Sequence, residues 1–132
     1  MEQPPFVSIY VWLVENIEKL GITTFSASQD VPKKMPVCRV QMIASNATTA
    51  FGNARQYTYT FQIDVVDAQD KLRQSLINAY KIMQLCREVS IEGYNVSCDD
   101  PSLTPMVDSS TNQILNRQII RINYTTIETT AF

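Results

Sequence analysis

The stretch from Tyr57 to Asp67, YTYTFQIDVVD, decides the fold because its side chains alternate in character. Apolar residues stand at every second position with polar ones between them, which is the pattern of a strand with one dry face. Burying this face contributes about 10 kcal/mol as an upper value, comparable with the net stability of a whole domain, so we expect it to be covered. The apolar positions are Tyr57, Tyr59, Phe61, Ile63 and Val65.

An amphipathic helix is predicted directly after this strand. Beyond Asp67 the alternation stops, and apolar residues recur three or four positions apart, as on one side of a helix. We predict that this helix runs to about Val89, that Asp67 is its N-cap, and that its apolar stripe covers the dry face of the strand. The stripe consists of Leu72, Leu76, Ala79, Tyr80 and Met83.

A second helix is predicted near the start of the chain. Pro5 suits the first turn of a helix, and Gly21 suits the stop after the last turn. Trp12 lies off the main apolar stripe, and it either borders the core or belongs to a subunit interface, where aromatic residues are enriched. The stripe consists of Phe6, Ile9, Tyr10, Leu13, Ile17 and Leu20.

The order of elements predicts an α+β fold, a two-layer sandwich with two helices on one face of a mostly antiparallel sheet of four to five strands. We expect a single domain over residues 1–132, a length that buries one core. Two polar segments are predicted to be long loops, one of small residues and one with two prolines. Besides the central strand, strands are expected at 22–28, 37–45, 94–98 and 113–127, and the loops at 46–55 and 99–112.

The two faces of this sheet are predicted to differ in polarity. In the strands beside the central one, we expect Cys38, Val40, Met42, Ala44, Ile120, Ile122 and Tyr124 to point toward the helices. The opposite face is predicted to be polar, and to be open unless another chain covers it. Its residues are Arg39, Gln41, Thr58, Thr60, Gln62, Arg117 and Arg121.

Residues for catalysis or for binding a cofactor or metal do not gather in any motif. The chain contains no histidine and its three glycines are isolated, which removes the usual general base and a phosphate-binding loop. The carboxylate pairs, Asp64 with Asp67 and Asp99 with Asp100, are expected to be structural, as outer-face, cap and turn residues. We therefore expect no enzymatic activity, no cofactor and no bound metal.

Net charge, hydropathy and cysteine spacing limit the classes of partner and of environment that we expect for this chain. The formal net charge of −2 and the pI near 5.0 argue against nonspecific binding to nucleic acid. The most apolar segment, from Phe6 to Leu20, is interrupted by charged residues and predicts neither a membrane span nor a signal peptide. Cys38, Cys86 and Cys98 fit no zinc or redox spacing; buried free thiols in a reducing compartment are expected, with a Cys38 to Cys98 bridge as the alternative.

Several segments together resemble the tail terminator, or tail completion, proteins of long-tailed bacteriophages, most of all the small tail proteins of siphophages of Gram-positive hosts. The resemblance covers nearly the whole chain and rests on element order, length and hydrophobic texture. The segments are PFVSIYVWLVENI from Pro5, PVCRVQMI from Pro36 with the polar stretch after it, YTYTFQIDVV from Tyr57, DKLRQSLINAYKIMQLC from Asp70 and NRQIIRINYTT from Asn116.

The resemblance implies a structural protein of the virion, made in the host cytoplasm and placed at the tail or neck. Such a protein forms a hexameric ring on the head-proximal end of the tail tube, where it ends polymerisation and joins the tail to the head connector. Its partners are copies of itself, the tail tube protein and the head-tail connector protein, with no membrane and no sequence-specific nucleic acid. A further neck or head completion protein of the virion is the neighbouring alternative.

A ring subunit needs two different surfaces that complement each other. We expect these on the polar sheet face and on the two long loops, where Phe51 either folds back onto its own strands or reaches a partner. An alternative of another class is an oligonucleotide- or ligand-binding domain that uses the same polar face. The predicted interface residues are Arg39, Gln41, Phe51, Arg55, Met106, Arg117 and Arg121.

Overall fold

The computed structural model describes residues 3–25, 35–52, 54–109 and 113–129, with side chains for all of these except 48–51 and 129. These residues form two α-helices, one 3-10 helix and six strands. In chain order the elements are α1 (Pro5–Glu18), β1 (Thr23–Phe25), β2 (Val37–Phe51), β3 (Ala54–Ala68), the 3-10 helix η1 (Gln69–Lys71), α2 (Leu72–Cys86), β4 (Val96–Cys98), β5 (Ser102–Asp108) and β6 (Leu115–Thr129).

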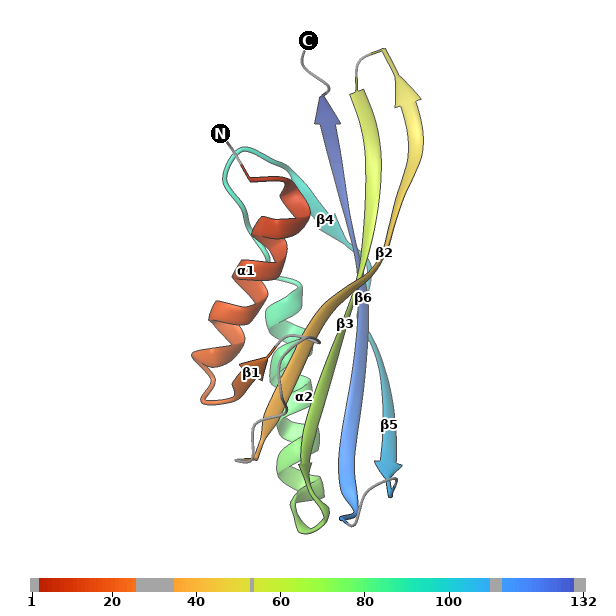
Figure 1. The fold of residues 1–132 in the computed structure, drawn as a ribbon. Coiled ribbons are helices and arrows are strands. Elements are labelled where there is room, and N and C mark those ends of the chain that lie inside the picture. Colours follow the sequence, from red (N-terminus) through yellow and green to blue (C-terminus); the bar gives the residue numbers. More distant parts are fainter. Residues whose placement is uncertain (1–2, 26–34, 53, 110–112, 130–132) are drawn as a thin grey trace.

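The described strands form one sheet in the order β1, β2, β3, β6, and both β4 and β5 pair with β6 along different parts of its length. All these pairs are antiparallel except β1 with β2. In Figure 1 the long strands β2, β3 and β6 form the middle of the sheet, and both helices lie on one face of it. The predicted α+β two-layer sandwich is confirmed, with six described strands where four to five were expected.

The core lies between the helices and the alternating residues of β3, as the pattern from Tyr57 onward predicts. Tyr59 is 2 % exposed and Phe61 is fully buried, while Tyr57 is half-buried and packs at the edge. On β6 the predicted inward residues are also buried. The buried apolar residues that the two helices and the three long strands contribute to this core are Ile9, Leu13, Ile17, Ala79, Ile82, Cys86, Cys38, Val40, Tyr59, Phe61, Ile63, Val65, Ile120, Ile122 and Tyr124.

Tyr124 links the two layers. Its ring meets the ring of Phe61 edge to face, with centroids 5.8 Å apart. Its hydroxyl donates a hydrogen bond of 2.7 Å to the carbonyl oxygen of Cys86, at the last residue of α2. The last carbonyls of a helix have no partner within the helix, so this bond satisfies one of them and holds the end of α2 on the sheet.

Helix α1 follows its predicted pattern. It begins at Pro5, and the chain leaves it through Gly21, whose φ of +87° is a conformation that glycine adopts without strain. Leu20, expected in the stripe, is 40 % exposed because it lies beyond the last turn. Trp12 is half-buried and packs against the core, as its core-border interpretation predicts.

The predicted stripe of helix α2 is confirmed only in part: Ala79 is buried and Met83 packs against the core. Leu72, Leu76 and Tyr80 are 48 %, 39 % and 61 % exposed, so this part of the predicted stripe is wrong. The small side chains on the buried side let α2 approach the large side chains of β3 and β6, because protein interiors are close-packed. The buried residues of α2 are Ser75, Asn78, Ala79, Ile82 and Cys86.

The prediction that Asp67 caps this helix is also wrong. Asp67 is buried in the last part of β3, where its carboxylate accepts a 2.8 Å hydrogen bond from the backbone N–H of Ala68. A 3-10 turn separates it from α2. Asn116 of β6 supports this turn, because its side-chain amide donates to the carbonyl oxygens of Ala68 and Gln69 at 2.9 and 3.0 Å.

The expected loop at 46–55 is instead the end of a long hairpin. Strand β2 continues to Phe51, β3 begins at Ala54, and the described turn residue Gly52 has a φ of +62°. The ladder shifts register between Met42 and Ala44 and again between Ala47 and Thr49. The first shift places Ala44 opposite Thr60, on the outer face, so its inward prediction is wrong. Met42 stands opposite Phe61 on the helix side, as predicted, but it is 37 % exposed.

The expected loop at 99–112 contains strand β5. This strand pairs with β6 from Ser102 to Asp108 despite Pro105, which stands opposite Gln118. Proline is tolerated there because β5 is an edge strand, and a residue on an edge can direct its missing N–H away from its neighbour. The predicted edge strand at 22–28 is confirmed for 23–25 as β1, and its residues 26–28 lie outside the described part of the chain.

Candidate functional site

The outer face of the sheet, defined here as the face away from both helices, is the candidate site. Among the described elements no helix lies on it (Figure 1). Directly paired residues share a face, so the strand registers assign its members without ambiguity. They include Arg39 and Gln41 of β2, Thr58, Thr60, Gln62 and Asp64 of β3, Arg117, Arg121 and Asn123 of β6, and Thr104 and Met106 of β5.

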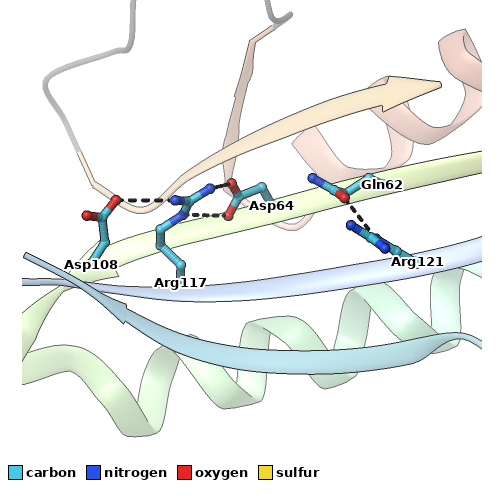
Figure 2. Close-up of polar contacts among 5 residues, drawn as sticks. All are labelled: Gln62, Asp64, Asp108, Arg117 and Arg121. Atoms are coloured by element: carbon cyan, nitrogen blue, oxygen red, sulfur yellow. Dashed lines mark hydrogen bonds and ion pairs between the residues drawn. The ribbon is translucent and has the colours of Figure 1, made fainter. Parts of the chain in front are cut away.

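Arg117 is held between two carboxylates on this face. Its guanidinium forms a two-point contact with Asp64, and its Nη1 lies 3.2 Å from Oδ2 of Asp108 on β5, as Figure 2 shows. The hydrogen bond to Asp64 raises the pKa of Arg117 above its already high ordinary value. The side chain of Asp64 is only 6 % exposed, so the pair is shielded from solvent on one side. The positive charge of Arg117 is therefore offset within the chain.

A polar row crosses the sheet beside this cluster. Gln41, Gln62 and Arg121 stand directly opposite one another on β2, β3 and β6. The Nε of Arg121 donates a 2.9 Å hydrogen bond to Oε1 of Gln62, drawn in Figure 2, and Arg121 is exposed. This row offers hydrogen-bonding groups whose positions are set by their neighbours, which lowers the entropy lost when a partner binds.

A second polar cluster fixes the connection between β4 and β5. The backbone N–H and side-chain amide of Asn123 donate to Asp99 at 2.9 and 2.7 Å, and the hydroxyl of Thr60 donates to Asn123. Asp100 forms a 3.4 Å ion pair with Arg87, in which both side chains are largely exposed. Asp99 therefore holds the segment between β4 and β5 against β6, in keeping with the structural role predicted for this carboxylate pair.

Arg39 is placed differently from the other two outer-face arginines. It is half-buried, and its guanidinium carbon lies 5.4 Å from the ring centre of Phe25 on β1. A cation over an aromatic ring gains modest stabilisation. Its Nε is buried and has no hydrogen-bond partner among the described groups. Among the described residues it is the one buried side-chain donor on the outer face without a hydrogen-bond partner.

The structure brings five of the seven predicted interface residues onto one face. Arg39, Gln41, Arg117 and Arg121 lie there with Met106, which stands opposite Arg117. Arg55 does not join them: it is exposed near the hairpin end, on the same face of β3 as Tyr57 and Tyr59. The side chain of Phe51 lies outside the described residues, so its predicted role stays a prediction.

Of the exposed apolar residues at the sheet margins, Met106 was predicted as an interface residue, whereas Met42, Ile43 and Val107 were not. Met42 and Ile43 on β2 are 37 % and 43 % exposed, and Met106 and Val107 on β5 are 43 % and 64 % exposed. A second apolar surface, on α2, combines the exposed side chains of its predicted stripe with Ile77. An adjacent apolar pair on an edge strand is a signal that periodicity does not detect, because alternation alone assigns one of the two to the core.

The cysteines are free thiols. Cys38 and Cys86 are buried, as predicted, and Cys98 is exposed, so its predicted burial is wrong. Burial raises the pKa of Cys86 to about 12 and raises that of Cys38 further still.

In the described part of the chain no three His, Cys, Asp or Glu residues are grouped to hold a metal. No helix in this part is long and apolar enough to cross a membrane.

Comparisons with known proteins establish the fold and no family. No protein-family model matches the chain, and no curated protein matches it. Solved structures similar to it include a protein designated only by a sequence identifier, which is 16 % identical with a TM-score of 0.62 over 96 % of this chain and 95 % of that one. That likeness shows a shared fold alone.

A weaker likeness is to the type 4 fimbrial biogenesis protein PilO from Pseudomonas aeruginosa. It is 9 % identical, with a TM-score of 0.40 over 96 % of this chain and 72 % of PilO. A likeness at this level carries no argument about function.

Proposed function

We propose that this protein is a structural subunit of a bacteriophage virion that forms a ring on the head-proximal end of the tail tube. There it ends tube polymerisation and joins the tail to the head connector. The proposal rests on the resemblance of the segments described above, and one structural observation supports it. Within the described part of the chain, both helices lie on one face of the sheet, and the outer face carries polar side chains that are held in place.

A ring subunit must meet its neighbours and a template at the same time. The outer face and the edge of β2, with its exposed Met42 and Ile43, provide two different surfaces for these contacts. Pre-positioned polar side chains, such as Arg121 on Gln62, favour specific recognition of a protein surface.

Electron microscopy of purified tail tubes tests the proposal directly. Tubes mixed with the protein are expected to carry a ring at one end and to stop growing when tube protein is added. In the phage that encodes the chain, deletion of its gene is expected to give overlong or unjoined tails. Unstable heads with tails of normal length would instead indicate a head completion protein, and tubes that keep growing would overturn the proposal.

A pair of charge-matched variants links the activity to the outer face. Arg121→Glu reverses the charge of an exposed outer-face residue, whereas Lys81→Glu makes the same change on the exposed side of α2. We expect Arg121→Glu to lose capping of tubes and Lys81→Glu to retain it. Equal capping by both variants would show that the polar row is not the contact surface.

A further inference from the structure

One edge of the sheet is open for most of the length of β2. Strand β1 pairs with Val37, Cys38 and Arg39 only, whereas β3 pairs with β2 along its full length on the other side. Within the described residues, no strand pairs with the edge of β2 opposite β3 from Val40 to Phe51. This segment, VQMIASNATTAF, has neither a charged residue nor a proline. Soluble proteins usually protect free strand edges with such residues, because unpaired N–H and C=O groups invite another strand.

The bulges of β2 leave a regular stretch between them. From Ala44 to Ala47 the ladder with β3 runs without interruption, opposite Thr60 to Tyr57. Ser45 and Ala47 are exposed in this stretch. An incoming strand can therefore pair with a regular segment of about four residues and follow the increased twist at either end.

The opposite edge of the sheet ends in β5. Its strand pairs with β6 on one side, and no described strand pairs with it on the other. Each edge displays two adjacent, exposed apolar side chains, Met42 with Ile43 on β2 and Met106 with Val107 on β5. On β5 the register places Met106 on the outer face, opposite Arg117, and Val107 on the other face, opposite Asn116, so a strand added at this edge brings a neighbour to both of them.

The directions of the strands allow the two edges to meet. Strands β2, β3, β6 and β5 are antiparallel in succession, so β5 runs opposite to β2. A second copy placed with its β5 beside β2 of the first therefore forms an antiparallel pair, the more stable arrangement of the two. A two-fold pairing of β2 with β2 would also be antiparallel, but it would leave Met106 and Val107 exposed on both copies.

We propose that copies of this chain join head to tail, with the free edge of β2 in one copy pairing with β5 of the next. A continuous sheet then runs from copy to copy, and both apolar pairs are covered. That the series closes as a ring rests on the function proposed above, whereas the pairing of the two edges does not require a phage role. Because the two edges differ, a copy that has joined one neighbour through β2 still offers its β5 to the next. The same contact can therefore repeat, as a cyclic assembly requires.

Hydrogen exchange measured by mass spectrometry tests the join on the full chain. The protein is compared when dilute and when concentrated or bound to tail tubes. We expect exchange to slow by about tenfold or more in β2 from Val40 onward and in β5, with little change in α1. Assembly that leaves both strands exchanging at the dilute rate would overturn the join.

Two blocking variants show which edges meet. Ser45→Lys places a charge on the β2 edge, and Val107→Lys places one on β5; both positions are exposed, so the fold should survive, which circular dichroism checks. Each variant alone is expected to stay monomeric in native mass spectrometry, with its dissociation concentration raised about tenfold or more. The matched control, Ser90→Lys, changes an exposed serine away from both edges and should assemble as the original protein does.

Mixing the two blocked variants separates head-to-tail from two-fold pairing. Each still has one intact edge of the opposite kind, so the mixture is expected to form dimers containing one of each and nothing larger. If Val107→Lys dimerises by itself, β2 pairs with β2 and the head-to-tail join is wrong.

Rings that cap tubes without protecting β2 overturn the join alone. Edge-joined assemblies that ignore tube ends overturn the proposed function alone, and a protein that stays monomeric even with tubes overturns both.

Discussion

The contacts of Arg117 show that the role inferred for a residue changes once its neighbours in space are known. In the sequence it is one of several arginines on a polar face, available to a partner. In the structure two carboxylates hold it, one from β3 and one from β5. Asp64 and Asp108 are 53 and 9 residues away along the chain, respectively, so no local pattern indicates the pairing. The cluster fastens β5 to the sheet as much as it prepares a surface.

The pattern from Tyr57 onward makes a prediction about single side chains. Phe61→Ala should lower the free energy of unfolding by about 3 to 5 kcal/mol, because Phe61 is fully buried against Tyr124. The adjacent Thr60→Ala removes a hydroxyl from the half-buried outer face and should cost less than about 1.5 kcal/mol. Urea unfolding of both variants measures the difference. Equal costs would mean that the two faces are assigned wrongly.

Buried thiol and phenol groups make stability depend on pH. Burial raises the pKa of Tyr124, Cys38 and Cys86 above their ordinary values of 10.0, 9.0 and 9.0. Above pH 9 the unfolded chain loses protons that the native protein keeps, so stability is complete below that pH and falls as the pH rises. Each group contributes a slope of about 1.4 kcal/mol per pH unit.

Unfolding by urea between pH 7 and 11 measures this slope. Tyr124→Phe should be less stable at neutral pH, because its bond to Cys86 is lost, and should show a shallower decline above pH 10. Stability that stays constant up to pH 11 in the original protein would contradict the prediction.

At the scale of elements, predictability depends on how local the cause of each feature is. Strand β3 was predicted well because period-two alternation in one segment determines which of its residues are buried. The buried side of α2 was predicted only in part. Ala79 and Met83 face the core as expected, but Ser75 and Ile82 do so in place of Leu72 and Leu76, because the choice depends on packing against β3 and β6. Hydrophobicity favours the wrong residues at these positions, and packing volume decides between the two.

The orientation of α2 gives a matched pair of variants. Ile82→Ala should lower the free energy of unfolding by about 2 to 5 kcal/mol, because Ile82 is fully buried. Leu76→Ala, at a position that is 39 % exposed, should cost less than about 1.5 kcal/mol. Thermal unfolding of the two variants at one protein concentration checks this order. The reverse order would restore the stripe predicted from hydrophobicity.

The two loop predictions, for 46–55 and 99–112, are wrong for a common reason. Small, polar or proline-containing residues are typical of loops, yet 46–51 belongs to β2 and 102–108 to β5. Both are held by long-range partners, β3 and β6, which supply the hydrogen bonds that weak strand formers do not secure alone. Such pairing is invisible in a single sequence, so these margins of the candidate site were predicted as loops and not as paired strands.

At the scale of the whole molecule, the distribution of charge decides which partners are excluded. The chain has a formal net charge of −2, and the most constrained outer-face cation, Arg117, is neutralised by carboxylates. We therefore expect no salt-dependent binding of single-stranded DNA or RNA at physiological ionic strength. Fluorescence titrations at several salt concentrations measure this.

Two further variants make that titration decisive. An affinity that is present and is lost on Arg39→Ala and Arg121→Ala would identify the outer face as an oligonucleotide site. It would then favour the binding-domain alternative over the virion role. Lys81→Ala serves as the control, since Lys81 is exposed on α2 and away from the outer face.

The placement of the three thiols allows the opening of the fold to be measured chemically. Cys98 faces solvent, whereas Cys38 and Cys86 lie on opposite layers of the interior, one on β2 and one at the end of α2. The thiolate is the nucleophile that attacks an alkylating reagent, so an enclosed thiol with an elevated pKa is inert until its surroundings open. The modification rates of Cys38 and Cys86 thus record how often helix and sheet part, without any label having to be introduced.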